Sequence, residues 1–190
     1  MLTTDVFASF RAFCEREGLP PDAVRERFAG DRQARELLVG LETGTLPEEE
    51  FEHALAEVLD VDSNDLINRM FAGSEPNEVM IEAVRRTRGA GIRTGLISNS
   101  WGSRRYDRGQ LAELFDGLVI SAEVGIRKPS PAIYGIGAER IGVAPDACVF
   151  VDDLPFNLKP AAELGMATVH HVETEQTIAE LERLLEVQLR

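Results

Sequence analysis

Lysine is scarce in this chain of 190 residues, which has only Lys128 and Lys159 beside eighteen arginines. Positive charge is also in short supply, because 33 acidic side chains outnumber 20 basic ones and leave a net charge of −13. A surface of this sign repels phosphate backbones and anionic membranes, so we expect neither a nucleic-acid partner nor a membrane partner. No apolar run approaches the ~18 residues of a membrane-spanning helix.

Cysteine is equally rare. Cys14 and Cys148 are far apart in the sequence, and each lies within an apolar pattern. We interpret them as reduced packing residues, which predicts a cytoplasmic protein. Hydrophobic residues make up 44% of the chain, which is enough for one core domain with a smaller insertion.

The chain divides into two unlike parts. Residues 5–74 show helical patterns only, whereas residues 75–190 alternate helices with short apolar strands, predicted at 94–97, 118–120, 148–151 and 167–169. Strands without polar alternation, separated by helices, are typical of a parallel sheet that is covered on both faces. The predicted fold class is therefore α/β, a Rossmann-like three-layer core that follows a helical segment.

Polar side chains follow three of these strands at the point where each strand ends. Ser98 and Asn99 follow the first strand, Lys128 lies in the loop after the second, and Asp152-Asp153 follows the third. Ligands of open parallel sheets bind beyond the carboxyl ends of the strands. We therefore expect these hydroxyl, amide, ammonium and carboxylate groups to converge on one edge.

This set of groups predicts a phosphate site with a magnesium ion. Adjacent carboxylates are costly without a cation, and Mg²⁺ binds one or two carboxylates together with a substrate phosphate. Ser98 could hold phosphate oxygens, and Lys128 could neutralise charge during phosphoryl transfer. Asn157, near the start of the next helix, could orient a metal-bound water. Each group alone is as readily explained as a turn, a helix cap or a solvated loop.

Three segments resemble motifs of the haloacid dehalogenase-like hydrolase superfamily. They are residues 97–100 (Ile-Ser-Asn-Ser), 125–134 (Gly-Ile-Arg-Lys-Pro-Ser-Pro-Ala-Ile-Tyr) and 149–153 (Val-Phe-Val-Asp-Asp). Residues 153–166 are similar to the phosphatase-type domain at the N-terminus of soluble epoxide hydrolases. The resemblance covers about residues 76–189, and the helical segment 5–74 stands where that family inserts its small helical cap.

The resemblance implies a function and a role for each matching residue. Ser98 and Asn99 would bind the transferring phosphoryl group, and Lys128 would stabilise both the phosphate and the attacking carboxylate. Asp152 and Asp153 would form the acidic end of the Mg²⁺ site, with Asp153 as the preferred direct ligand. The implied protein is a Mg²⁺-dependent phosphatase of a small phosphorylated metabolite, acting through an aspartyl-phosphate.

The family's nucleophile, the first Asp of a motif after the first strand, has no counterpart in residues 1–190. Asp5 is the only nearby acid, and we interpret it as a helix cap. We expect the nucleophile upstream of Met1, on a segment that would also supply the central strand of the sheet. Without that strand we expect an apolar slot, which could drive oligomerisation, and no significant turnover.

Two other functions remain open. A haloacid-type dehalogenase shares the fold and needs no metal, but its fourth motif differs from the acidic pair Asp152-Asp153. If Met1 is the true start, the chain could instead be a catalytically inactive binding protein. Elsewhere, we expect His170 and His171 to be one solvated and one half-buried side chain rather than metal ligands. Trp101 and Tyr106 could line the cap or simply pack, and we expect Arg104, Arg105 and Arg108 to be solvated.

Overall fold

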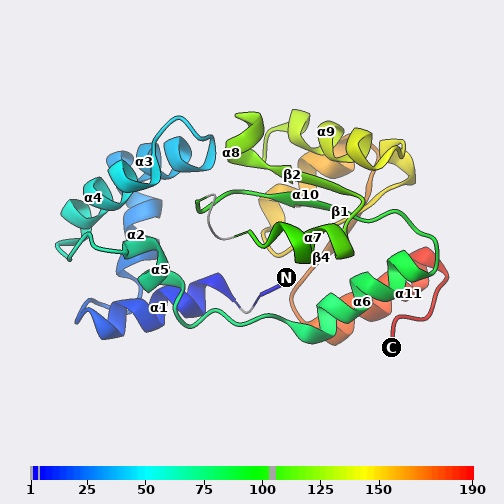
Figure 1. Cartoon of the computed structure of the whole chain (residues 1–190), viewed down its shortest axis with the longest axis horizontal. Coiled ribbons are helices and arrows are strands. Elements are labelled where there is room, and N and C mark those ends of the chain that lie inside the picture. The colour runs from blue at the N-terminus through cyan, green and yellow to red at the C-terminus, as the bar shows by residue number, and fades with distance from the viewer. Residues whose placement is uncertain (1, 4, 103–105) are drawn as a thin grey trace.

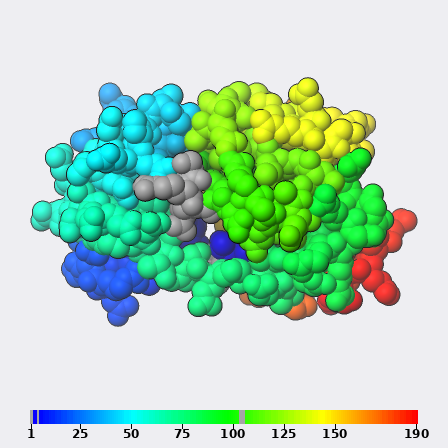
Figure 2. Space-filling view, in the orientation of Figure 1, coloured from blue at the N-terminus to red at the C-terminus, as the bar shows by residue number. Residues whose placement is uncertain are grey.

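The computed structural model describes residues 2–3, 5–102 and 106–190, so Arg104 and Arg105 lie outside the described residues. A helical region and an α/β region lie side by side along the long axis of the molecule (Figures 1 and 2). In the part of the chain that is described, no helix combines the length and apolar character needed to cross a membrane.

The helical region contains five helices. These are α1 (Val6–Arg16), α2 (Ala23–Gly30), α3 (Arg32–Glu42), α4 (Glu48–Leu59) and α5 (Leu66–Phe71). The carboxylate of Asp5 accepts a hydrogen bond of 2.9 Å from the backbone N–H of Phe7 and caps α1, as predicted. Three glutamates fill the first turn of α4, where the helix dipole favours negative charge.

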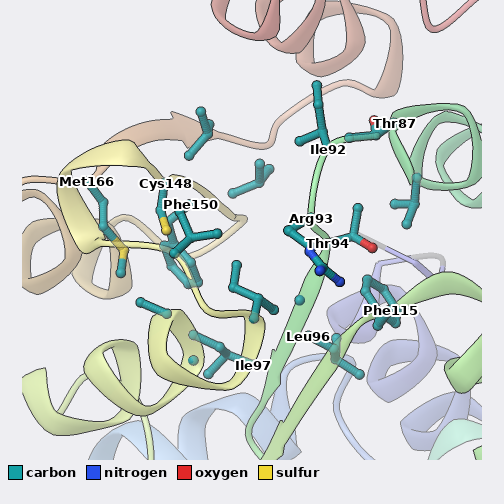
Figure 3. Close-up of a pocket in the computed structure, with 18 of the residues that line it drawn as sticks. Thr87, Ile92, Arg93, Thr94, Leu96, Ile97, Phe115, Cys148, Phe150 and Met166 are labelled. Carbon is teal, nitrogen blue, oxygen red and sulfur yellow. The ribbon is translucent and has the colours of Figure 1, made fainter. Parts of the chain in front are cut away.

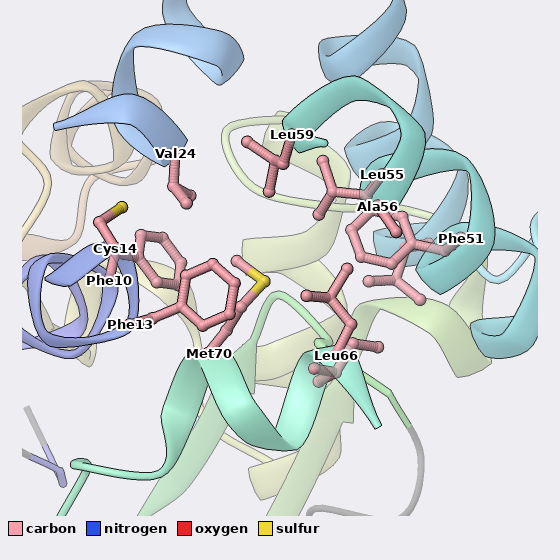
Figure 4. Packing of buried hydrophobic residues seen from close by; sticks show 12 residues of the cluster. Phe10, Phe13, Cys14, Val24, Phe51, Leu55, Ala56, Leu59, Leu66 and Met70 are labelled. Atoms are coloured by element: carbon pink, nitrogen blue, oxygen red, sulfur yellow. The ribbon is translucent and has the colours of Figure 1, made fainter. Parts of the chain in front are cut away.

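The helices of this region enclose their own hydrophobic core (Figure 4). Apolar residues at helical spacing supply it, so that Phe10, Phe13 and Cys14 of α1 meet Phe51 and Leu55 of α4 in the interior. Burial of these side chains is what holds five short helices together, because helices of this length are marginal in isolation.

The α/β region has four short strands, each followed by a helix. The strands are β1 (Gly95–Ser98), β2 (Gly117–Ile120), β3 (Val149–Asp152) and β4 (Ala167–His170). The longer helices are α6 (Glu78–Gly89), α7 (Arg108–Leu114), α9 (Pro131–Ile141), α10 (Pro155–Glu163) and α11 (Thr174–Leu185); α8 (Ser121–Val124) is a single turn after β2. The strands lie within one residue of their predicted positions.

Helices cover both faces of the strands and make three layers (Figure 1). On one face, α9 and α10 pack on Ile97, Val119 and Phe150. On the other face, α6 and α7 pack on Leu96 and Leu118, and α11 packs on α6. Neighbouring strand residues thus point to opposite faces, as the pleat requires. The α/β Rossmann-like class is confirmed.

The four strands form two separate parallel pairs rather than one continuous sheet. β1 pairs with β2 and β3 pairs with β4, each in register over four residues. In the described part of the chain, β1 and β3 are not paired with each other. This division agrees with the expectation that the central strand of the sheet has no counterpart in residues 1–190.

Candidate active site

Lys128 and Asp152 form a buried ion pair at the carboxyl end of β3. The ammonium Nζ of Lys128 lies 2.7 Å from Oδ2 of Asp152. Asp152 is 1% exposed and Lys128 is 9% exposed, so water does not screen this pair. The Lys128 ammonium also stands 5.7 Å from the centre of the Phe150 ring. A side chain from the loop after α8 and one from the end of β3 are thus brought together as the sequence predicted.

The second carboxylate oxygen of Asp152 is held by two further donors. The backbone N–H of Leu154 donates to Oδ1 at 2.9 Å, and the Asn157 side-chain amide donates to the same oxygen at 3.0 Å. Asn157 is itself buried, and its backbone carbonyl accepts a 2.7 Å hydrogen bond from the hydroxyl of Tyr134. Burial and the negative charge of Asp152 raise the pKa of Tyr134, so its proton stays available for this bond.

Asn99 clamps the backbone of Lys128 from both sides. Its Oδ1 accepts from the Lys128 N–H at 2.8 Å, and its Nδ2 donates to the Lys128 carbonyl at 3.1 Å. The Asn99 side chain therefore positions the lysine loop instead of pointing to a phosphate. The prediction that Asn99 binds phosphate stays untested, because the contacts of its side chain are with the Lys128 backbone.

Ser98 ends β1 with its hydroxyl 2.8 Å from the phenol oxygen of Tyr106. Either oxygen can donate this hydrogen bond. The serine is partly exposed at the same edge as Lys128, since the next residue, Asn99, bonds the Lys128 backbone. A hydroxyl pair of this kind can exchange its internal bond for bonds to an oxyanion.

The acidic pair at the end of β3 is divided between two environments. Asp152 is buried and both of its oxygens are bonded, whereas the side chain of Asp153 is exposed. Carboxylate oxygen is the donor that Mg²⁺ prefers, and one or two carboxylates with waters and phosphate complete its shell. The residues therefore fit this ion, and the choice of Asp153 as its direct ligand stays a prediction. No group of three or more His, Cys, Asp or Glu suited to a metal occurs among the described residues.

A buried acid of the helical region reaches the lysine loop. Glu42, at the end of α3, is 4% exposed, and its Oε2 lies 2.6 Å from Nε of Arg127. Burial raises the pKa of Glu42 to about 7, although the positive charges of Arg127 and Lys128 oppose the shift. The Glu42 carbonyl accepts from the Ser121 hydroxyl, which itself accepts from the Ser100 N–H. The two regions thus meet beside Lys128.

Trp101 fastens the β1 loop to the helical region. Its ring packs against the rings of Phe10, Phe28, Phe51 and Phe71, with ring centres 5.3 to 6.0 Å apart. The sequence left open whether Trp101 lines the interface with the helical region or simply packs, and the ring lies at that interface.

His170 and His171 have the exposures that the sequence predicted, one solvated and one half-buried. His170 is exposed, and its Nε2 lies 3.2 Å from the carbonyl of Asp153. His171 is half-buried with its Nδ1 2.8 Å from the Thr177 hydroxyl, and burial lowers its pKa. Arg108 is exposed and pairs with Glu123, in agreement with a solvated helix start.

Residues 2–165 match the family of haloacid dehalogenase-like hydrolases. This chain belongs to that family. The match covers both the helical region and most of the α/β region, so the resemblance seen in three motifs extends across the chain.

Curated relatives of the chain include phosphatases and larger enzymes. It is 32% identical over 131 residues to bifunctional epoxide hydrolase 2 of Sus scrofa, which is 65% of this chain and 24% of that protein. The chain thus spans about a quarter of that relative. It is 31% identical over 103 residues to glyceraldehyde 3-phosphate phosphatase of Methanopyrus kandleri, which is 52% of this chain and 44% of that protein.

Solved structures share the fold. A HAD-like family hydrolase from Porphyromonas gingivalis is 25% identical with a TM-score of 0.67, covering 88% of this chain and 90% of that one. A HAD family enzyme from Bacteroides thetaiotaomicron, crystallised with magnesium and inorganic phosphate, is 20% identical with a TM-score of 0.65. It covers 89% of this chain and 86% of that one, and at this identity it supports the fold alone.

Sequence reasoning missed the roles of three residues that shape this site. Tyr134 stood within a quoted motif and Tyr106 was noted only as a packing candidate. Glu42 gave no signal, because its partner Arg127 lies 85 positions away in the sequence. The one signal in the sequence was the adjacent pair Arg127-Lys128, because two neighbouring cations each favour an acidic partner.

Proposed function

We propose that this hydrolase is a Mg²⁺-dependent phosphatase of small phosphorylated metabolites. The observation that carries the proposal is the buried ammonium of Lys128, anchored by Asp152 at the edge where Ser98 ends β1. A cation that is held at the end of a strand and largely shielded from water stabilises the negative charge of a transferring phosphoryl group. The chain's phosphatase relatives are consistent with this chemistry.

Each residue of the site has a proposed task. Lys128 binds the phosphate and the attacking carboxylate, and Asn99 and Asp152 hold it in place. Ser98 and the backbone N–H group of Asn99 bind phosphate oxygens. Asp153 holds the Mg²⁺, which would neutralise charge on the phosphate, and Asn157 fixes the orientation of Asp152.

The nucleophile in this proposal is an aspartate upstream of Met1. Its carboxylate would attack phosphorus and release the alcohol, and water would then hydrolyse the aspartyl-phosphate. Among the described residues, no carboxylate other than the Asp152-Asp153 pair stands at the carboxyl end of a strand. We therefore propose that residues 1–190 alone give no significant turnover, that α1–α5 act as the cap that selects substrate, and that the enzyme is cytoplasmic.

The test is turnover of a panel of phosphate esters with Mg²⁺, by residues 1–190 and by an upstream-extended chain that supplies the aspartate. We expect turnover from the extended chain only, and a loss of at least about a hundredfold in Asp153→Asn. The matched control is Asp146→Asn, which changes an exposed aspartate in the turn before β3 and should keep full activity.

The outcomes separate the competing functions. An extended chain that releases halide from haloacids without a metal would make the protein a dehalogenase. If the extended chain hydrolyses no ester and Asp153→Asn changes nothing that is measured, only a binding role would remain for the site.

A further inference from the structure

The mainly apolar cavity between β1 and β3 stops short of the edge where the phosphate site lies. It has a volume of about 280 Å³, and Figure 3 shows Cys148 on one side of it and Phe115 on the other. Its lining ends at Ile97 of β1 and Val151 of β3, one residue before the carboxyl end of each strand. An anion at Ser98 therefore takes its further ligands from the loops beyond the strands.

The loop after β1 brings a second hydroxyl group next to Ser98. The phenol oxygen of Tyr106 lies 2.8 Å from Oγ of Ser98, and both side chains are partly exposed. An oxygen that accepts a hydrogen bond from Ser98 lies about 2.7 Å from Oγ, and therefore no more than about 5.5 Å from the Tyr106 hydroxyl. Any anion that Ser98 binds is thus a close neighbour of this phenol.

The protons of these two hydroxyl groups favour an oxyanion over each other. Oγ of Ser98 also lies 3.4 Å from the Asn99 carbonyl oxygen, so its single proton has two neutral acceptors, this carbonyl and the Tyr106 oxygen. A hydrogen bond from a hydroxyl to an ionised oxygen is shorter and roughly twice as strong as one between neutral groups. Exchange of the Ser98–Tyr106 bond for two bonds to one anion is therefore favourable.

Two contacts hold Tyr106 in this place. Directly after it, Asp107 caps α7, and its Oδ1 accepts from two backbone N–H groups of the first turn at 2.9 and 3.1 Å. The guanidinium carbon of Arg108 lies 5.9 Å from the centre of the Tyr106 ring, and Arg108 is itself ion-paired with Glu123 of α8. The phenol is thus positioned before a ligand arrives, which lowers the entropic cost of a contact with that ligand.

We propose that Tyr106 is a phosphate-binding residue, whose hydroxyl donates a hydrogen bond to an oxygen of the phosphoryl group that Ser98 also binds. The inference rests on the proposed phosphatase function, because it needs a phosphate at Ser98. It adds a side-chain donor that comes from the loop before α7 and not from the end of a strand. Two hydroxyl donors suit a tetrahedral oxyanion, which presents several oxygens, better than they suit a halide.

The chain has only two tyrosines, which makes the contact observable. The other one, Tyr134, is buried, and its hydroxyl donates to the Asn157 carbonyl at 2.7 Å. Tyrosine labelled with carbon-13 at the ring carbon that bears the oxygen gives two NMR signals, which Tyr106→Phe assigns. In a titration of the 190-residue chain with inorganic phosphate and Mg²⁺, we expect the Tyr106 signal to shift with the same midpoint as the Ser98 amide. The Tyr134 signal should move far less.

Variants separate a direct bond to phosphate from an effect through Ser98. We expect Tyr106→Phe to weaken phosphate binding about tenfold, because a hydrogen bond to a charged oxygen is lost while the ring stays. The same loss should appear in the Ser98→Ala background, since each hydroxyl binds the anion by itself. Thr168→Val, the matched control, removes a hydroxyl from the middle of β4 opposite Phe150 and should keep the wild-type affinity. Melting temperatures establish that each variant is folded.

The other outcomes are equally decisive. A loss in Tyr106→Phe that disappears in the Ser98→Ala background would make Tyr106 a positioning residue for Ser98 and would overturn the proposal, as would an equal loss in Thr168→Val. Phosphate binding at Ser98 and Lys128 with unchanged affinity in Tyr106→Phe would overturn the role of Tyr106 and leave the phosphate site standing. If the wild type binds no phosphate at this edge, the role of Tyr106 and the phosphatase function are both wrong.

Discussion

The ammonium of Lys128 lies 2.7 Å from the Asp152 carboxylate, and the pair joins the loop after α8 to the carboxyl end of β3. Because β1 and β3 have no shared strand, this ion pair is one of the links between the two halves of the α/β region. The ion pair also fixes the position of the Lys128 ammonium near Ser98.

Lys128→Met should destabilise the protein by about 3 to 5 kcal/mol, because it leaves the buried charge of Asp152 without its cation. Urea denaturation measures the change in the free energy of unfolding. Lys159→Met removes the other lysine of the chain, whose side chain is 81% exposed, and should change stability by less than about 0.5 kcal/mol. Equal effects of the two variants would show that the Lys128–Asp152 pair is not a buried interaction.

Asn99→Ala should cost about 1 to 3 kcal/mol, because the variant leaves the backbone N–H and carbonyl of Lys128 without their partners. Since the lysine loop then loses its clamp, affinity for inorganic phosphate should fall as well. Asn64→Ala, at an exposed site before α5, is the matched control and should leave both quantities unchanged. A variant as stable as the wild type would remove Asn99 from this positioning role.

Glu42 should make stability depend on pH. Its carboxyl has an ordinary pKa of 4.5 when unfolded and about 7 when buried, so the folded state holds the proton more tightly. The stabilisation is complete below pH 4.5 and is lost as the pH rises through 7, on the order of 3 kcal/mol in total.

Glu42→Gln should remove this dependence and unfold at higher urea concentration than the wild type at pH 8. Glu57→Gln, on the exposed face of α4, should keep the wild-type profile. A wild-type stability curve that matches Glu42→Gln between pH 5 and pH 8 would contradict the burial of this acid.

Trp101→Ala should loosen the contact between the helical region and the β1 loop. Four phenylalanine rings surround the indole, and its removal should cost about 3 kcal/mol in the free energy of unfolding. Phe156→Ala removes an aromatic ring that is 57% exposed and should cost far less. Protease cleavage between the two regions, faster in Trp101→Ala alone, would identify the contact as the one that is lost.

Local patterns were enough to predict the strands and the edge where the site lies. Apolar runs without alternation predicted β1 to β4, and the positions just after them predicted that Ser98, Lys128 and Asp152 share one edge. The division into two strand pairs follows from the same reasoning, since the expected central strand has no counterpart in residues 1–190.

Pairings between distant side chains could not be predicted in this way. The Asn99 side chain bonds a backbone 29 positions away, and Glu42 meets Arg127 across two regions of the chain. Such contacts depend on the final packing and leave no periodic signal in the sequence. The difference between Asp152, which is buried, and Asp153, which is exposed, could not be predicted either, because the sequence shows only two adjacent aspartates.

The most direct test of the phosphate site is a titration of the 190-residue chain with inorganic phosphate and Mg²⁺, followed by residue-resolved amide NMR. It needs no turnover and therefore no nucleophile. We predict saturable shifts centred on Ser98, Asn99 and Lys128 that weaken at least about tenfold in Asp153→Asn but not in Asp146→Asn. Shifts that are absent from this edge, or that gather on the exposed arginines instead, would contradict the account.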